Sequence, residues 1–307
     1  MKTFDSAWYS LMTPSDDFAE QAPYALAGEA GQSVPFVFNS PHSGNYYPRR
    51  FLAMSRLDRN AIRRSEDCFV DELFAGAVAQ GAAMVMAHFP RAYLDVNREP
   101  WELDPRMFRE PLPPFANIRS PRVAGGLGAL PRIVGEGQEI YEGRLPLSEA
   151  IGRIDCAYKP YHAELSRLLI ATRERFGHAI LIDCHSMPGS VRAGEGALRA
   201  DFIVGDRFGA SCVPDLTECV VGLLTRMGYK VAHNRPYAGG FITEHYGRPR
   251  QGLNALQIEV SRSLYMNERT YQKSDGFFAL AKDLSTFCAA LIELEGELFP
   301  ALPLAAE

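Results

Sequence analysis

Two histidines stand just after apolar segments, where their side chains could bind a metal ion. His42 follows the run 34–38, and His185 follows the run 179–184. A catalytic zinc ion usually takes three protein ligands, drawn from His and carboxylate side chains, and leaves one position open for water. His42 could instead cap a turn, and His185 could be a core histidine. An imidazole without a partner is costly inside a buried strand, so His185 needs a partner in either case.

The acidic candidates for the same ion are the adjacent residues Glu66 and Asp67. Acidic residues also interact favourably with the dipole in the first turn of a helix, so their type alone does not identify a metal ligand. Asp183 lies two residues before His185, on the same face of the expected strand. It could orient that histidine, or it could make a loop or cap contact.

Motifs of several other enzyme classes are absent from the sequence. There is no G-x-S-x-G elbow, no G-x-G-x-x-G fingerprint and no Walker loop. H-E-x-x-H is absent as well, so any metal site must be assembled from distant positions. The six cysteines contain no C-x-x-C pair, which argues against a Cys-ligated zinc or a disulfide scaffold and favours a reducing cytosol.

Composition indicates a globular protein without a nucleic-acid or membrane partner. The 307 residues are 47% hydrophobic and 22% charged, with a net charge of -5, so no basic excess is present to bind nucleic acid. No apolar run approaches the roughly 20 residues that span a bilayer. The N-terminus lacks the pattern of a secretory signal. We therefore expect a cytoplasmic protein.

Strands that alternate with helices predict the fold class. Strands are expected at 34–38, 82–89, 179–184, 202–205, 229–233 and 256–260, an extended piece at 92–96, and helices at 57–80, 146–176, 214–227 and 267–298. This alternation predicts an α/β fold with a mostly parallel or mixed central sheet and helices on both faces. Residues 1–307 are expected to form a single catalytic domain, with 98–145 as a long excursion or lid. Ligands in such folds bind beyond the carboxyl ends of the strands, where His42, Arg98 and His185 lie.

Taken together, these segments resemble the N-formylglutamate amidohydrolase family. The matching motifs are S-P-H-S-G at 40–44, S-E-D at 65–67 with V-D-E-L-F at 70–74, R-A-Y-L-D-V-N-R at 91–98, D-C-H-S-M-P at 183–188, G-G-F-I-T at 239–243, Q-I-E-V at 257–260 and Y-M at 265–266. They follow the family's order from about residue 34 to 266. The family is related in fold to zinc carboxypeptidases, so the resemblance implies a phosphorylase/hydrolase-like α/β sheet with a single metal ion.

The resemblance implies that His42, Asp67 and His185 bind this ion, which is expected to be Zn²⁺. Asp67 is preferred because it occupies the acidic position before the Val-Asp segment of the family pattern. Glu66 stands where many members have a small or hydroxyl residue, and it stays an alternative ligand.

The resemblance also implies a metal-dependent amidohydrolase that releases formate from N-formyl-L-glutamate, a step of histidine degradation. A divalent metal lowers the pKa of water to about 7, and that water would attack the formyl carbon. Glu259 would act as the base and then as the acid. Glu259 could instead pair with Arg262. The alternatives are a hydrolase of the same fold for another N-acyl amino acid or a small peptide, and a non-catalytic metal-binding protein.

Arginines are the expected partners of the substrate's negative charges, because the guanidinium group binds a carboxylate through two hydrogen bonds. Arg98, with Asn97 beside it, resembles the carboxylate-binding pair of the carboxypeptidases. It could instead form a loop ion pair with Asp95 or Glu99. Arg91 is the candidate cation for the oxyanion that forms during amide cleavage.

A second group of expected substrate contacts lies in the segment 239–247, which we interpret as a flap. It contains Thr243, a candidate for substrate binding. Arg248 and Arg250 follow the segment directly, and either could bind a side-chain carboxylate. The sequence does not choose between them.

Overall fold

The computed structural model describes residues 13–135, 137–192 and 199–299. Contacts between residues group the chain into two compact units. Unit 1 contains residues 1–26, 40–69 and 85–168, and unit 2 contains residues 27–39, 70–84 and 169–307. None of the helices in the described part of the chain is long and apolar enough to span a bilayer. The six cysteines, all of them among the described residues, form no disulfide.

A seven-stranded sheet with the order β1-β3-β2-β4-β7-β5-β6 is the central element of the fold. Strands β2, β4 and β7 pair in parallel, β5 runs antiparallel to β7, and β6 is parallel to β5. The sheet is therefore mixed and mostly parallel, which confirms the expected α/β class. The strands are β1 (Tyr24–Ala27), β2 (Phe36–Ser40), β3 (Ala83–Ala87), β4 (Ala179–Met187), β5 (Phe202–Gly205), β6 (Val231–His233) and β7 (Leu253–Ser261).

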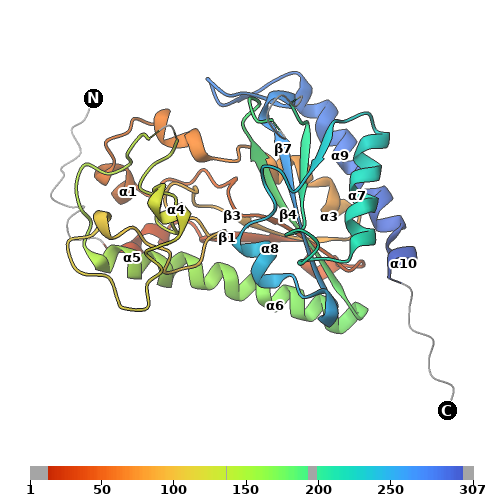
Figure 1. Cartoon of the computed structure of the whole chain (residues 1–307), viewed down its shortest axis with the longest axis horizontal. Helices are drawn as coiled ribbons and strands as arrows, with labels where there is room; N and C mark the ends of the chain where they lie inside the picture. Colours follow the sequence, from red (N-terminus) through yellow and green to blue (C-terminus); the bar gives the residue numbers. More distant parts are fainter. Residues whose placement is uncertain (1–12, 136, 193–198, 300–307) are drawn as a thin grey trace, which may run out of the picture. The chain divides into compact units, whose positions relative to one another are not determined.

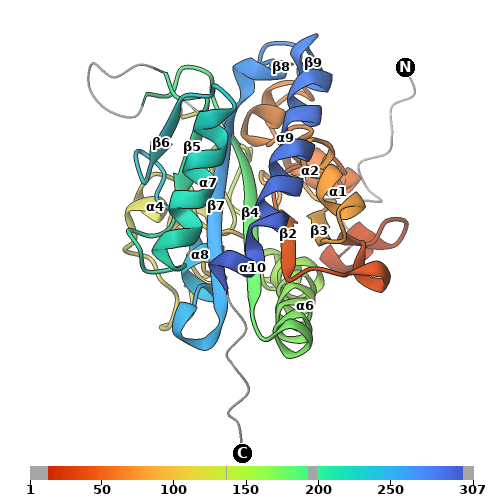
Figure 2. The same cartoon turned by 90° about the vertical axis from the view of Figure 1, so that its right-hand side faces the viewer.

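Within unit 2, helices α7 (Pro214–Arg226) and α9 (Gly276–Glu293) lie side by side over one face of the strands, as Figure 2 shows. Each presents a buried apolar stripe at helical spacing, such as Leu280, Leu284 and Leu291 in α9. All nine residues of β4 are buried, which is typical of a parallel strand in the middle of a sheet. The remaining helices and strands of this unit are η3 (Glu29–Gly31), α2 (Val70–Phe74), α3 (Gly76–Ala79), α8 (Phe241–Tyr246), η7 (Pro249–Gln251), η8 (Arg262–Leu264), β8 (Met266–Asn267), β9 (Gln272–Lys273) and α10 (Glu295–Leu298).

Unit 1 contains more loop than regular structure, and residues 98–146 run mostly as loops (Figure 1). Its core includes the fully buried Arg153, which pairs with Glu149 and lies 4.2 Å from the centre of the Tyr93 ring. The lid function of 98–145 stays a prediction. The helices are η2 (Pro14–Phe18), α1 (Arg49–Met54), η4 (Ala61–Ser65), η5 (Pro105–Met107), α4 (Pro121–Ala124), α5 (Leu147–Arg153), the π-helical η6 (Ile154–Tyr158) and α6 (Lys159–Phe176), which continues into unit 2.

The helix expected at 57–80 is wrong as a continuous element. Helix η4 ends at Ser65 and α2 begins at Val70, and Phe69 between them has a φ of 64°. A bulky residue in this left-handed region is uncommon and interrupts the helix. The buried apolar residues that suggested one period belong to separate helical turns. Because the helix is interrupted, Asp67 lies outside any helix.

Two further expected elements differ from the structure. Residues 92–96 form turns and not an extended piece, because Tyr93 N donates to Pro90 O at 2.9 Å. The last helix begins at Gly276 and not at Asn267, since the preceding residues form the two-stranded sheet of β8 and β9. The strand expected at 202–205 and the helical segment ending at Phe176 are confirmed.

Candidate metal centre

Three buried side chains come together in a group that could hold a metal ion. The ligand atoms of His42, Asp67 and His185 all lie within 4.8 Å of one another. These residues are 1%, 1% and 3% exposed. Two imidazoles and one carboxylate are a donor set that catalytic zinc takes while keeping a position for water. The three residues therefore fit a divalent metal in the chemistry of their donors.

His42 lies in the loop after β2, and its ring is oriented by a buried carboxylate. Its Nε2 lies 2.8 Å from Asp95 Oδ1, and its Nδ1 lies 3.4 Å from Asp67 Oδ2. The backbone N–H of Asp67 donates to the carbonyl of His42 at 3.0 Å. A carboxylate at Nε2 keeps the proton on that nitrogen and the lone pair on Nδ1, where a metal would bind.

Asp95, Arg91 and Arg98 form a group of charged side chains next to His42, which we call the Asp95 hub. Asp95 is 1% exposed, and its Oδ2 accepts from Arg91 Nε at 2.9 Å and lies 3.7 Å from Arg98 Nε. The N–H of Asn97 donates to Oδ1 at 2.9 Å. Burial alone would raise the pKa of Asp95, but the charges of Arg91 and Arg98, with His42, hold it well below its usual range. Asp95 is therefore ionised.

The residue types predicted Asp95 only as an ion-pair partner of Arg98, and not as the carboxylate that orients His42. That ion pair is present, and the same carboxylate also contacts His42. The available signal was the acidic residue two positions before Asn97-Arg98 in a matching motif.

His185 lies within β4, and its orienting carboxylate comes from the same strand. Its Nε2 lies 2.9 Å from Asp183 Oδ2. Asn39 stands opposite Asp183 in the parallel register of β2 and β4, and its Nδ2 donates to Asp183 Oδ1 at 2.7 Å. The contact that the sequence suggested between Asp183 and His185 is thus present. As at His42, a carboxylate at Nε2 assigns Nδ1 to the metal side.

Glu259 stands beside His185 on the neighbouring strand. The parallel register of β4 and β7 pairs these two residues, so their side chains project from the same face of the sheet. Glu259 is 8% exposed, and its Oε1 accepts from Gln257 Nε2 at 2.9 Å. Gln257 Oε1 in turn accepts from the N–H of Gly240 at 3.0 Å. Gln257 therefore fixes the Glu259 carboxylate, a role that the sequence analysis did not assign.

Glu66, the alternative ligand, lies outside the metal-capable group and has other partners. Arg63 donates to it through Nε at 3.0 Å and Nη2 at 2.9 Å, and the Tyr47 hydroxyl also donates to it. Cys68 Sγ lies 3.1 Å from Glu66 Oε2. Burial, and then the charge of Glu66, raise the pKa of Tyr47 well above its usual range. Asp67 is thus the carboxylate of the group.

The two arginines expected to contact substrate lie in the Asp95 hub. Arg91 is 26% exposed. Arg98 donates through Nε to Leu127 O at 3.0 Å and through Nη1 to Asn97 O at 2.7 Å. Burial lowers the pKa of Arg98 to about 10, so the group stays charged at neutral pH. Their substrate-binding roles stay predictions.

The segment interpreted as a flap contains helix α8. The hydroxyl of Thr243 is buried and donates to Gly240 O at 3.0 Å, at the start of this helix. Arg248 Nη1 donates to Glu244 O at 2.6 Å and to Gly247 O at 2.7 Å, which is the contact of a cation with the last carbonyls of a helix. The substrate-binding roles of Thr243 and Arg248 also stay predictions.

Sequence comparison relates the chain to known amidohydrolases. The family model described as N-formylglutamate amidohydrolase matches residues 34–266. An N-formylglutamate deformylase of Pseudomonas putida is 30% identical over 245 residues, which cover 76% of this chain and 83% of that protein. A deformylase of the same name from Pseudomonas aeruginosa is 29% identical, with 84% of this chain and 90% of that protein covered.

Solved structures agree with this relationship. The crystal structure of N-formylglutamate amidohydrolase from Ralstonia eutropha has a TM-score of 0.82 at 34% identity, and the match covers 91% of this chain and all of that one. The gene product Atu2144 of Agrobacterium tumefaciens has a TM-score of 0.64 at 20% identity over 90% of this chain and 98% of its own. The second likeness concerns the fold alone.

Proposed function

Since the chain belongs to the N-formylglutamate amidohydrolase family, we propose that it is a metal-dependent amidohydrolase releasing formate from N-formyl-L-glutamate. The observation that carries the proposal is the buried group of His42, Asp67 and His185, with Glu259 beside His185 on the next strand. The reaction consumes one water: the formyl C–N bond breaks, a C–O bond forms, and the products are formate and L-glutamate.

The proposed ion is Zn²⁺, held by His42 Nδ1, a carboxylate oxygen of Asp67 and His185 Nδ1. When bound, such an ion polarises a carbonyl oxygen and makes water more acidic. Asp95 and Asp183 keep the two imidazoles in the tautomer that binds a cation.

Glu259 is proposed to move the proton that the reaction requires. Gln257 donates to Oε1, so we assign proton transfer to Oε2. The carboxylate first takes a proton from the attacking water and then delivers it to the nitrogen of the departing glutamate. The second proton of the water, left on the formic acid, passes to the same nitrogen, so the products are formate and L-glutamate with a protonated amino group and no other proton donor is needed.

The arginines of the Asp95 hub are proposed to bind the substrate's charges. Arg98 and Asn97 would hold the α-carboxylate, and Arg91 would stabilise the oxyanion. Asp95 holds Arg91 and Arg98 in place through ion pairs. Substrate binding therefore does not have to restrict the conformations of these two side chains. Replacing Arg98 with Ala should raise KM for N-formyl-L-glutamate, and loss of its ion pair with Asp95 should also lower the free energy of unfolding.

Formate release from N-formyl-L-glutamate by the purified zinc-loaded protein tests the proposal directly. His185→Ala should lose both bound zinc, measured by elemental analysis, and hydrolysis. Glu259→Gln should retain zinc and lose turnover, because the amide cannot accept the water's proton. Near-normal turnover by the Gln variant would remove Glu259 as the base. If the wild-type protein instead cleaves a panel of N-acetyl amino acids and not the formyl compound, the proposed substrate is wrong.

A further inference from the structure

Unit 1 contains a cavity, lined by both polar and apolar side chains, that has no role in the proposed reaction. Its volume is about 660 Å³, within the range of about 300–1,000 Å³ that is usual for small-molecule sites. Its walls include two arginines and no acidic residue. The lining residues are Asn45, Tyr47, Leu52, Arg59, Asn60, Ile62 and Arg63.

The cavity adjoins the two ligand-bearing segments of this unit. Asn45 and Tyr47 follow His42 by three and five residues, and Arg63 precedes Asp67 by four. The backbone hydrogen bond from Asp67 N to His42 O joins the two segments at 3.0 Å. Two lining residues, Tyr47 and Arg63, also contact Glu66, the residue before Asp67, so the cavity wall lies close to the segment that carries this carboxylate.

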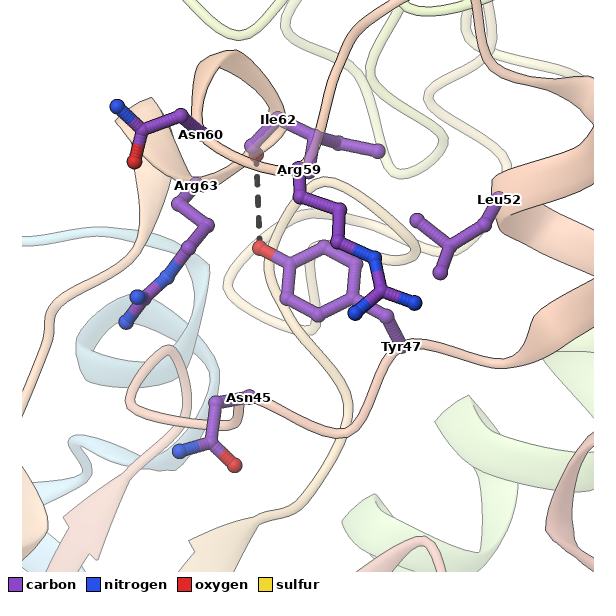
Figure 3. A pocket seen from close by; sticks show the side chains of 7 residues that line it. All are labelled: Asn45, Tyr47, Leu52, Arg59, Asn60, Ile62 and Arg63. Atoms are coloured by element: carbon purple, nitrogen blue, oxygen red, sulfur yellow. Dashed lines mark hydrogen bonds between the residues drawn. The ribbon is translucent and has the colours of Figure 1, made fainter. Parts of the chain in front are cut away.

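The two arginines differ in how their charges are compensated. Arg63 donates to Glu66 through Nε and Nη2, whereas Arg59 has no hydrogen bond or ion pair with any residue that the structure describes. Arg59 lies in the turn that precedes helix η4, and Arg63 lies within that helix. In Figure 3 the side chains of Arg59 and Arg63 extend from this turn and helix, and the Asn45 side chain lies below them with its amide directed away. The cavity therefore has an uncompensated cation at its wall.

We propose that this cavity is the subsite for the side-chain carboxylate of an acidic N-acyl amino acid, and that Arg59 is the cation that recognises it. The assignment rests on the proposed function, because it takes the amide of the substrate to lie at the metal group. A carboxylate would pair with Arg59 through charged hydrogen bonds. Arg248 and Arg250, the earlier candidates for this carboxylate, lie in a different segment of the chain.

Kinetics with two nearly isosteric substrates test the subsite. Arg59→Ala should raise KM for N-formyl-L-glutamate by about 10- to 100-fold, since hydrogen bonds between charged groups contribute strongly to binding, and should leave kcat little changed. KM for N-formyl-L-glutamine, which lacks the charge, should change by less than about threefold. Arg59 is exposed, so its replacement should not impair folding.

Two matched variants accompany this measurement. Arg49→Ala removes an exposed cation of helix α1 that does not line the cavity, and it should leave both KM values unchanged. Arg248→Ala tests the earlier candidate. If Arg248→Ala abolishes the preference for glutamate over glutamine while Arg59→Ala retains it, the subsite is assigned to the wrong arginine.

A binding measurement separates this inference from the proposed function. Glutarate should raise the melting temperature of the wild-type protein and of Arg49→Ala, and not that of Arg59→Ala. If the wild type fails to release formate but shows this pattern, the proposed reaction is wrong and the carboxylate site stands. If glutarate stabilises Arg59→Ala as well as the wild type, the carboxylate site is wrong, whatever the enzyme hydrolyses.

Discussion

The two histidines of the metal-capable group are positioned by different kinds of structure. His185 and its carboxylate Asp183 are two residues apart on β4, a strand paired on both sides. His42 lies in a loop, and its carboxylate Asp95 comes from a turn 53 residues further along the chain. The histidine–carboxylate contact is nearly the same length in both, at 2.9 and 2.8 Å.

The surroundings of the two carboxylates differ more than the contacts themselves. Asp183 accepts from the neutral amide of Asn39, whereas Asp95 lies against the charged Arg91 and Arg98. A regular strand register needs no charge to hold a side chain in place, since the backbone ladder does so. A loop lacks such a ladder, and here buried ion pairs replace it. Asp95 should therefore contribute to folding and to metal binding, and Asp183 mainly to metal binding.

Asp95→Asn should have the largest effect. It removes the negative charge between two arginines, and breaking a buried ion pair in this way costs about 3–5 kcal/mol. We expect about 3 kcal/mol, near the lower end of that range, because Arg91 is 26% exposed and can be partly solvated. Zinc affinity should also fall by about 10- to 100-fold. Urea unfolding of the metal-free protein and a zinc titration measure the two effects. A change in unfolding free energy below about 1 kcal/mol, the size of a single neutral hydrogen bond, would show that the ion pairs do not hold the loop.

Asp183→Asn should reduce zinc affinity without a comparable loss of stability. The amide oxygen can still accept from Asn39, but the amide nitrogen donates and so conflicts with a proton on His185 Nε2. The imidazole would then carry its proton on Nδ1, the nitrogen assigned to the metal. We expect zinc affinity to fall by about 10- to 100-fold and the unfolding free energy by about 1 kcal/mol. Equal losses of stability in the Asp95 and Asp183 variants would remove the distinction between the two regions.

The sequence predicted the strands around His185 better than the loops and turns around His42. The apolar runs that become β2, β4 and β7 were recognised because a buried parallel strand consists almost entirely of hydrophobic residues. The break before α2 was missed, because the left-handed backbone at Phe69 has no signal in the residue types. The turn at Tyr93 was read as extended for a similar reason, since its hydrogen bond to Pro90 O is not visible in a hydrophobic pattern.

The candidate site shows the same limit. Spacing alone left Glu66 and Asp67 equivalent, and only the family pattern favoured Asp67. The distinction is tertiary, because Arg63 and Tyr47 bind Glu66 and leave its neighbour to the metal group. Asp95 was likewise recognisable as an ion-pair partner from its sequence neighbours, but its contact with His42 joins segments that no local pattern relates.

Asn39→Ala should have the smallest effect of the series, and it asks whether the strand register alone can position Asp183. The variant removes the donor to Asp183 Oδ1, at a cost of about 1 kcal/mol in unfolding free energy. The backbone pairing of β2 with β4 is unchanged, so zinc affinity should fall by less than about tenfold, the lower limit expected for loss of an orienting group.

Asn254→Ala is a matched control: this buried amide on β7 accepts from Val213 N at 3.0 Å, so its loss should cost similar stability with no change in zinc affinity. A zinc affinity as low in Asn39→Ala as in Asp183→Asn would mean that the amide, and not the strand, holds the carboxylate against His185.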